Sequence, residues 1–319
     1  MPIKFGTIVP QGWRLDLTHI PDPIDKYEHM TRYAREAEKL GFDSIWVYDH
    51  FHTVPTQELE SSFECWTITA ALARDTERVR VGQMVTCNNY RQPSLLAKMA
   101  STVDVMSHGR LDFGIGAGWY EEEYRAFGYD FPDGPERLRM LDEALQIIHA
   151  MWKEPYATFE GKYYQVRGAI NEPKGVQKPH IPLWVGGSGE KVTLKLVAKY
   201  ADACNVVGND PAVTKHKLDV LKEHCERLGR DYGSIIKSAH TFMVLQNPGE
   251  SFEDAIKEHP HLTLQAAQST VYGQPNEMID KLGALVDAGV EYFIFYTRNR
   301  PADLDTLRML AQDIMPALK

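Results

Sequence analysis

The sequence has few cysteines and lacks any long run of apolar residues. Its four cysteines, at positions 65, 87, 204 and 225, lie far apart, and no two of them form a CxxC pair. This spacing excludes a zinc ribbon and a disulfide framework, so we expect reduced thiols in a cytoplasmic protein. A membrane-spanning helix needs roughly eighteen or more consecutive apolar residues, and the sequence contains no such run. The first residues, MPIKF, enter a strand-like segment directly, without the apolar stretch typical of a signal peptide.

An excess of positive charge is also absent. The chain carries 35 lysine and arginine residues against 44 aspartate and glutamate residues, which gives a formal net charge of -9. A general nucleic-acid binder or a protein that binds anionic membranes needs a basic face, so neither class is expected. A local basic pocket for an anionic small molecule is compatible with this net charge. At 319 residues the chain can bury a large core without a disulfide or a structural metal.

Short apolar segments alternate with stretches of helical periodicity along almost the whole chain. This alternation predicts eight strands, over residues 3–9, 44–48, 79–85, 111–115, 183–185, 203–207, 235–245 and 292–296. Parallel neighbours need a crossover connection, so strands that are each followed by a helix predict a parallel sheet. Eight such units favour one closed (β/α)8 TIM barrel, with an open doubly wound sheet as the alternative. No linker rich in glycine, serine or proline divides the chain, so residues 1–319 are predicted to form a single domain.

The alternation breaks between residues 155 and 182. This segment contains several prolines, and residues 158–166, TFEGKYYQV, have the pattern of two short strands joined near Gly161. We therefore expect a hairpin within an insertion in the barrel. Together with the loops at 53–62 and 246–274, this insertion is expected to determine the shape of the barrel's opening.

In barrels of this kind the reactive groups lie at the carboxyl ends of the strands. The second strand ends in YDHFH, residues 48–52. His50 is a candidate acid/base group because an imidazole exchanges protons near neutral pH. The alternative without chemistry is that Asp49 and His50 cap the next helix or bond to each other.

Two histidines in an HxH spacing, His50 and His52, would also suit a metal ion. Such a site needs further His, Asp or Glu ligands from other strand ends. Those ends offer instead Thr86, Ala117, Gly186, Asn205 and Thr297. We therefore expect no bound metal.

The fifth strand is followed by VGGSGEK, residues 185–191. Small residues before a helix that begins near Glu190 leave backbone N–H groups able to bind an anion, and the helix dipole favours negative charge there. Ser188 adds a hydroxyl donor. This pattern predicts a phosphate contact at Gly187 and Ser188, with a plain helix cap as the alternative.

The third and fourth strands end in a polar and a glycine-rich segment. Residues 86–89, TCNN, offer hydrogen bonds to the polar edge of a ring or are ordinary loop polarity, and Cys87 has no paired base in the sequence. Residues 114–119, GIGAGW, have a GxGxG spacing that does not fit the GxGxxG dinucleotide fingerprint. These small residues let the backbone approach a flat ligand beside Trp119, or they permit a tight barrel turn. The glutamates at 121–123 are predicted to form a solvated first turn of helix.

These segments, in this order, resemble the bacterial luciferase-like superfamily, and within it the branch that uses the deazaflavin coenzyme F420. The matching stretches are AEKLGFDSIW (37–46), DH (49–50), RQPSLLAKMA (91–100), GRLDFGIGAGWYEEE (109–123) and KPHIPLWVGG (178–187). The similarity runs over essentially the whole chain. Members that use flavin mononucleotide (FMN) share much of it, so FMN is the alternative cofactor.

The resemblance implies roles for individual residues. His50 falls where the family has a histidine beside the reactive carbon of the deazaflavin, as a proton donor or acceptor. Asp49 would contact the ring or orient the imidazole. Gln83-Met84 falls where relatives carry a non-proline cis peptide that forms a bulge behind the ring. The other implied cofactor contacts are Thr86 and Asn88 at the ring edge or ribityl chain, Ala117, Gly118 and Trp119 in the cleft, and Gly186, Gly187 and Ser188 at the phosphate.

The sequence also departs from part of the family. Some sugar-phosphate dehydrogenases of the superfamily have a second acid/base glutamate where this chain has Trp119, and a tryptophan where it has Val54. Sugar-phosphate oxidation is therefore not expected. Trp119 together with Tyr163 and Tyr164 of the insertion predicts a more apolar substrate pocket.

The sequence thus favours an oxidoreductase that transfers a hydride between coenzyme F420 and an organic carbonyl, alcohol or activated alkene. His50 would exchange the accompanying proton. The second hypothesis is an FMN-dependent monooxygenase that uses reduced flavin and O2, and the third is a non-catalytic flavin-binding relative. Because relatives are commonly dimers, the resemblance also implies a homodimer.

Overall fold

Eight parallel strands close into a barrel in the computed structural model, which describes every residue except 1, 208, 258–269 and 300. The strands are β1 (Lys4–Ile8), β2 (Ser44–Val47), β3 (Arg80–Gln83), β5 (Leu111–Gly116), β8 (Leu183–Gly186), β9 (Ala203–Val207), β10 (Ile236–Leu245) and β12 (Tyr292–Thr297). Each strand pairs in parallel with the next, and the pairing of β12 with β1 closes the ring. The predicted (β/α)8 barrel is confirmed, and the open sheet is excluded.

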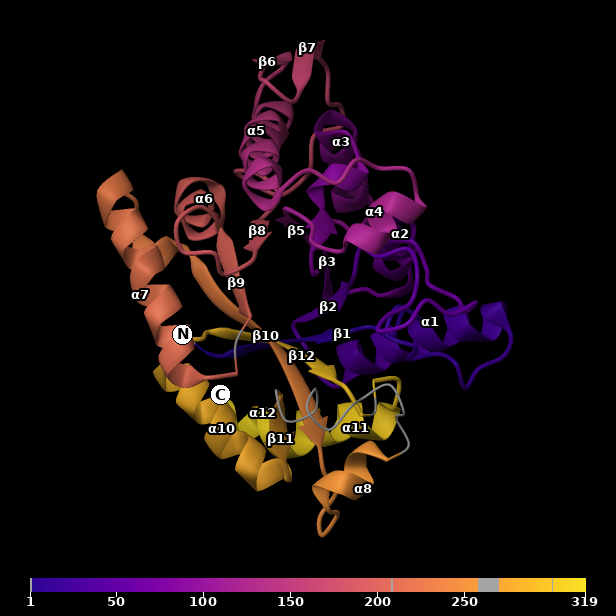
Figure 1. The fold of residues 1–319 in the computed structure, drawn as a ribbon. Coiled ribbons are helices and arrows are strands. Elements are labelled where there is room, and N and C mark those ends of the chain that lie inside the picture. The colour runs from indigo at the N-terminus through magenta and orange to yellow at the C-terminus, as the bar shows by residue number, and fades with distance from the viewer. Residues whose placement is uncertain (1, 208, 258–269, 300) are drawn as a thin grey trace.

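Helices connect the strands and surround the barrel (Figure 1). The main ones are α1 (Pro23–Lys39), α2 (Cys65–Asp75), α3 (Pro93–Met106), α5 (Gly134–Lys153), α6 (Thr193–Tyr200), α7 (Pro211–Leu228), α10 (Pro275–Asp287), and α11 (Leu304–Met309) continued by the π-helical turn η3 (Leu310–Ile314) and α12 (Met315–Leu318). The connections also hold α4 (Glu121–Ala126), α8 (Phe252–Ile256) and the 3-10 turns η1 (Asn88–Tyr90) and η2 (Tyr232–Ser234). Within the described residues, none of the helices has both the length and the apolar character needed to cross a bilayer.

Helix α1 illustrates how local sequence places a helix on the barrel. The Asp22 carboxylate accepts hydrogen bonds from the N–H groups of Ile24 and Asp25, at 2.8 and 3.1 Å, and so satisfies donors that a helix start leaves unpaired. Met30 and Ala34, four residues apart, lie on one face and are fully buried against the strands. Capping and periodicity therefore fix both the start of the helix and the face that it buries.

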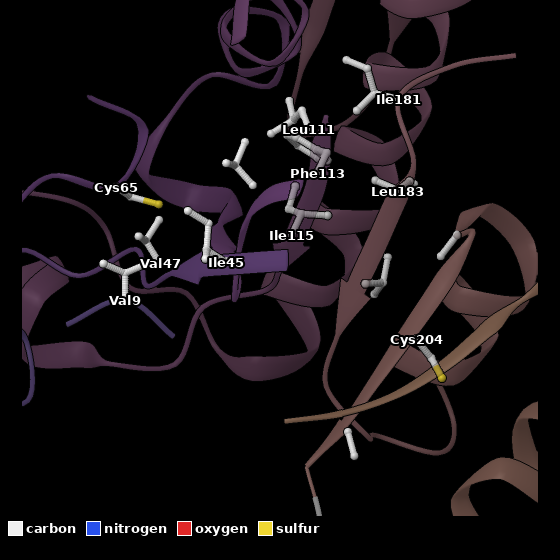
Figure 2. Close-up of a cluster of buried hydrophobic side chains, with 14 of the residues drawn as sticks. Val9, Ile45, Val47, Cys65, Leu111, Phe113, Ile115, Ile181, Leu183 and Cys204 are labelled. Carbon is white, nitrogen blue, oxygen red and sulfur yellow. The ribbon is translucent and has the colours of Figure 1, made fainter. Parts of the chain in front are cut away.

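Alternate residues of the strands enter two different cores. On β2, Ile45 and Val47 point outward into the layer between strands and helices, part of which Figure 2 shows. Trp46 points inward, where its ring centroid lies 4.8 Å from that of Trp184, and Trp184 lies 5.3 Å from Tyr292. These large rings fill the barrel interior, so open space at the barrel axis is left to the ends of the strands.

The third strand differs from the prediction, which placed one continuous segment over residues 79–85. The structure divides it into β3 and the short β4 (Thr86–Cys87), which pairs with β5. The non-proline cis peptide lies at Met84–Val85, so its prediction at Gln83–Met84 was wrong by one bond. The Met84 N–H still donates to the Val47 carbonyl at 2.8 Å, so the ladder with β2 continues through Met84 and ends at the following bond.

The insertion forms the predicted hairpin, with β6 (Ala157–Glu160) antiparallel to β7 (Gln165–Ala169). Glu143 of α5 accepts hydrogen bonds from the N–H groups of Lys162, Tyr163 and Tyr164 at 2.8, 2.8 and 3.0 Å. The turn of the hairpin is therefore fixed to α5, and Figure 1 shows both strands beside this helix at the top of the view.

Candidate active site at the carboxyl ends of the strands

A cavity of about 500 Å³ opens at the carboxyl ends of the barrel strands. Ten of the twelve residues selected from the sequence line it: Asp49, His50, Met84, Thr86, Ala117, Gly118, Trp119, Gly186, Gly187 and Ser188. They follow or end β2, β3, β5 and β8, which are neighbours in the barrel. Because ligand sites of barrel enzymes occupy this end, the cavity is the candidate active site.

Gln83 and Asn88 lie outside the lining of this cavity. The Gln83 side chain turns toward α2, where its amide donates to the Thr69 hydroxyl at 3.1 Å. The Asn88 amide donates to the Tyr164 hydroxyl, also at 3.1 Å. Both side chains therefore make structural contacts in the helical layer, and the cofactor contact expected of each stays a prediction.

The hairpin aromatics Tyr163 and Tyr164 are also outside the lining. Tyr164 is buried against Asn88, and the Tyr163 hydroxyl accepts from Arg139 of α5 at 3.1 Å. The prediction that these two rings make the substrate pocket apolar was wrong. The prediction failed because Glu143 bonds the turn of the hairpin to α5. The hairpin therefore lies beside this helix and not over the opening of the cavity.

Glu123 is the main residue of this site that the sequence did not identify. The solvated helix turn predicted for residues 121–123 was wrong at this position, because the Glu123 side chain is fully buried. One of its oxygens lies 2.7 Å from Nδ1 of His50 and 2.8 Å from the Tyr90 hydroxyl. The other accepts from the backbone N–H groups of Phe51 and His52 at 2.7 and 3.3 Å. Four contacts thus fix this carboxylate beneath the imidazole.

The surroundings of Glu123 favour its ionised form. Burial would raise the pKa of Glu123, but the contacts from His50, the Phe51 N–H and the Tyr90 hydroxyl together hold it below its usual value. An ionised carboxylate only accepts hydrogen bonds, so Nδ1 of His50 must donate. The neutral imidazole then carries its free lone pair on Nε2, the nitrogen left to exchange a proton in the cavity.

Asp49 has a structural partner other than His50. Both of its oxygens accept from the Arg91 guanidinium, at 2.6 and 3.0 Å, and one also accepts from the Cys87 N–H at 2.8 Å. Burial raises the pKa of Asp49, and the charge of Arg91 opposes this effect. Arg91 also pairs with Glu64, the N-cap residue of α2. Asp49 therefore holds β4 in place, and the alternative in which Asp49 and His50 bond to each other is excluded.

Aromatic rings surround the imidazole of His50. The Trp13 ring stacks on it with a centroid distance of 3.9 Å and an interplanar angle of 3°. Trp119 and Tyr120 approach it edge-on at 5.9 and 6.0 Å. Trp13 was not among the residues selected from the sequence. It lies in the segment that follows the carboxyl end of β1, which also supplies the cavity-lining residue Arg14.

The glycines at the ends of β5 and β8 make room for the bulge between β3 and β4. A Cβ atom on Gly114 would lie 1.9 Å from the Gln83 carbonyl oxygen. On Gly116 and Gly186 it would lie 2.9 and 2.8 Å from the Val85 side chain. These glycines therefore allow Met84 and Val85 to form part of the cavity floor, which favours the steric explanation of the glycine-rich segment.

The loop after β8 closes the far end of the cavity. Helix α6 begins at Thr193, later than the predicted start near Glu190, so the loop runs longer before the helix. Gly187 has φ +117°, a conformation that favours glycine, and its N–H donates to the Asn205 carbonyl. Ser188, Gly189 and Thr193 line the cavity at this end. Ser188 and Thr193 thus line the cavity where the sequence predicts a phosphate contact, whereas the Gly187 N–H is already bonded to Asn205.

Neither a metal site nor a reactive thiol is built from the described residues. They contain no group of three or more His, Cys, Asp or Glu side chains placed to hold a metal ion. His52 contacts the Thr53 carbonyl at 3.3 Å and does not line the cavity. Burial raises the pKa of the Cys87 thiol to about 12, so this cysteine stays protonated.

The closed parallel barrel, with a histidine and a buried carboxylate at its cavity, defines a ligand-binding α/β-barrel protein. The family described as luciferase-like monooxygenase matches residues 3–266. The chain belongs to this family, which confirms the resemblance found in the sequence.

Curated relatives and solved structures extend the comparison. An F420-dependent glucose-6-phosphate dehydrogenase of Intrasporangium calvum is 32% identical over 97% of this chain and 98% of its own length. One from Microbacterium testaceum is 26% identical over 89% of this chain and 91% of its own length. The structure of an F420-dependent secondary alcohol dehydrogenase in complex with an F420-acetone adduct covers both chains fully, with a TM-score of 0.82 and 22% identity. The coenzyme F420-dependent tetrahydromethanopterin reductase of Methanopyrus kandleri also covers both chains fully, with a TM-score of 0.78 and 19% identity. At these identities the two structures show a shared fold.

Proposed function

We propose that the protein is an oxidoreductase that transfers a hydride between coenzyme F420 and an organic carbonyl, alcohol or activated alkene. The observation that carries the proposal is the His50–Glu123 pair, at 2.7 Å, placed at the wall of the cavity. The F420-dependent relatives that match nearly the whole chain support the choice of cofactor.

The residues of the cavity fit a flat ring with an anionic tail. Met84 and Val85 of the bulge and the Trp119 side chain line the cavity and would contact the ring. The segment Gly186–Ser188 would hold the phosphate, with Thr193 adding a hydroxyl at the start of α6. When bound, the deazaflavin supplies the two-electron hydride chemistry.

The chain's own part in the reaction is to orient the substrate and move one proton. Glu123 holds Nδ1 of His50, so Nε2 is the atom that takes the proton from an alcohol oxygen or returns it to a carbonyl oxygen. The stacked Trp13 ring and the edges of Trp119 and Tyr120 limit access of water to the imidazole. Positioned general acid/base groups of this kind contribute roughly 10²–10⁴-fold to rate.

Glucose 6-phosphate, named for the relatives, is not carried over to this chain. Trp119 occupies the place of the second acid/base glutamate, and it is 61% exposed at the rim of the cavity. Val54, which occupies the place of a tryptophan, is buried, and its N–H donates to the Trp13 carbonyl at 2.8 Å. Neither side chain offers a second proton carrier.

Equilibrium binding with the two candidate cofactors tests the proposal. We expect the purified protein to bind F420 and to oxidise or reduce it in the presence of an alcohol or carbonyl panel. Binding of FMN with no binding of F420 would favour the monooxygenase hypothesis. Binding of either cofactor with no turnover on any tested substrate would favour the non-catalytic relative.

The homodimer and the cytoplasmic location stay predictions. The helices after the second and third strands carry apolar residues that would suit a two-fold interface, and Leu95 on α3 is 54% exposed. Light scattering on the eluting protein would measure the mass of the particle in solution.

A further inference from the structure

The order of strands around the barrel divides the cavity into two arcs. The proposed cofactor residues belong to the adjacent strands β2, β3, β5 and β8. Other lining residues belong to the opposite arc: Asn205 on β9, His240 and Phe242 on β10, and Trp13 and Arg14 in the segment after β1. His50, at the end of β2, lines the same cavity. If the deazaflavin occupies the first arc, as the proposed function requires, the substrate must lie against the second.

Arg14 brings a positive charge into this second arc. Its guanidinium carbon lies 4.1 Å from the Trp13 ring centroid and 5.8 Å from that of Phe242. Within the described part of the chain, its Nε is buried and has no hydrogen-bond partner. The guanidinium carbon of Arg298, which follows β12, lies 5.7 Å from the same Phe242 ring. Two guanidinium groups thus lie near the Phe242 ring, and of the two Arg14 lines the cavity.

Among the described residues, the two carboxylates nearest to Arg14, Asp49 and Asp16, are engaged by other donors. Asp49 is the one carboxylate among the described residues that line the cavity, and both of its oxygens accept from Arg91. Asp16 lies below the lining, where it accepts from the Gly12 N–H at 2.6 Å and from the Tyr296 hydroxyl at 3.4 Å. Burial raises the pKa of Asp16 to about 6, which weakens it further as a counter-charge in mildly acidic solution.

The two other polar side chains of this arc among the described lining residues, His240 and Asn205, are neutral. His240 lies 3.0 Å from the Tyr48 hydroxyl, and burial together with the nearby Arg14 lowers its pKa to about 3. Asn205 donates to the Ser238 hydroxyl at 3.0 Å. The second arc therefore combines aromatic walls, neutral hydrogen-bonding groups and the positive charge of Arg14, a combination suited to an anion.

We propose that Arg14 forms a subsite for an anionic group on the substrate, a carboxylate or a phosphate. Trp13 determines the position of this subsite, because its ring stacks on His50 and also packs against the Arg14 guanidinium. The imidazole and the guanidinium therefore pack on opposite faces of the Trp13 indole, and a substrate that reacts beside His50 must extend past this ring to place its anionic group at Arg14. The substrate class is an organic acid, or a phosphate ester other than a sugar phosphate, whose carbonyl or alcohol is separated from its charge by a spacer that reaches past the Trp13 ring.

Ligand binding to the protein without deazaflavin tests this subsite separately from the proposed function. The probes are 4-oxopentanoate, its uncharged methyl ester and inorganic phosphate, at constant ionic strength, with binding read from tryptophan fluorescence because Trp13 contacts Arg14. We expect the acid to bind at least about tenfold more tightly than the ester, since a charge-assisted hydrogen bond is about twice as strong as a neutral one. Tighter binding of phosphate than of the acid, lost in Arg14→Met, would assign the subsite to phosphate esters, whereas phosphate binding that Arg14→Met retains would belong to the segment Gly186–Ser188.

Three variants test whether the preference for the anion depends on Arg14. Arg14→Met is expected to abolish the preference for the anion, whereas Arg14→Lys keeps the charge and part of the affinity. Arg227→Met removes one positive charge from the exposed surface of α7 and is expected to bind like the wild type. Melting temperatures confirm that each variant is folded.

Three results would overturn the subsite. They are equal binding of acid and ester, an unchanged preference in Arg14→Met, and displacement of the bound anion by F420. The last result would assign Arg14 to the cofactor. Because the titration needs no deazaflavin, failure to bind F420 would count against the proposed function and leave this test readable.

Discussion

At the scale of single residues, the chemistry depends on side chains that are distant in sequence. His50 was predictable because a histidine at a strand end is a local signal. Its partner Glu123 lies 73 residues away in one of three successive glutamates. Only the start of α4 after Tyr120 decides which of the three points inward, and the residue types alone do not reveal this choice.

Replacing Glu123 by glutamine tests its role as a positioning residue. The amide would present a donor to Nδ1 of His50 and so favour the tautomer whose proton is on Nε2, the wrong atom for accepting one. We expect kcat for alcohol oxidation to fall by about 10²-fold or more, while the affinity for F420 stays that of the wild type. Steady-state kinetics and cofactor titration measure the two quantities.

The matched control is Glu122→Gln, which changes an exposed glutamate of the same helix turn. It should keep wild-type kinetics, and Glu123→Asp should recover part of the lost kcat because it restores the carboxylate. A Glu123→Gln enzyme with normal kcat, or one in which only KM or cofactor affinity changes, would remove Glu123 from the proton-transfer apparatus.

At the scale of elements, the site depends on how β5 and β8 accommodate the segment between β3 and β4. The sequence predicted the glycine-rich end of β5 but left two explanations open, a ligand approach or a tight turn. The structure shows the protein's own atoms against these glycines, with the Gln83 carbonyl at Gly114 and the Val85 side chain at Gly116. The cis peptide was placed one bond too early for a related reason. The pairing of β3 with β2 continues through Met84, and residue types alone do not show where this pairing ends.

Alanine substitutions at three glycines test this packing. Gly114→Ala is expected to lower the free energy of unfolding by about 3 kcal/mol or more, because the new Cβ meets a backbone carbonyl that cannot move independently. Gly116→Ala should lower the free energy of unfolding by less, since its new Cβ meets the end of the Val85 side chain. Gly283 lies in the middle of α10 with open space around it, so Gly283→Ala should raise the free energy of unfolding by about 1 kcal/mol. Chemical denaturation of the three variants measures the order, and equal effects of Gly114→Ala and Gly283→Ala would contradict it.

At the scale of the whole molecule, the fold was predictable and the shape of the cavity was not. Alternating strand and helix periodicity is a local property, and it predicted all eight barrel strands, with every end within two residues of its observed position. The positions of Trp13, Arg14 and Phe242 around one opening depend on barrel closure, which brings the first and last strands together. The hairpin was predicted from its own residues, but its attachment to α5 depends on Glu143, which the pattern of the insertion does not contain.

Single-turnover hydride transfer in two histidine variants tests the central claim most directly. The protein would be loaded with reduced F420 and mixed with carbonyl compounds including 4-oxopentanoate, and oxidation of the deazaflavin would be followed by its absorbance. His50→Gln should bind F420 like the wild type yet react about 10²-fold or more slowly, while His52→Gln, which changes a histidine outside the cavity, should react at the wild-type rate. Equal rates in His50→Gln and the wild type would contradict the assignment of the proton to His50.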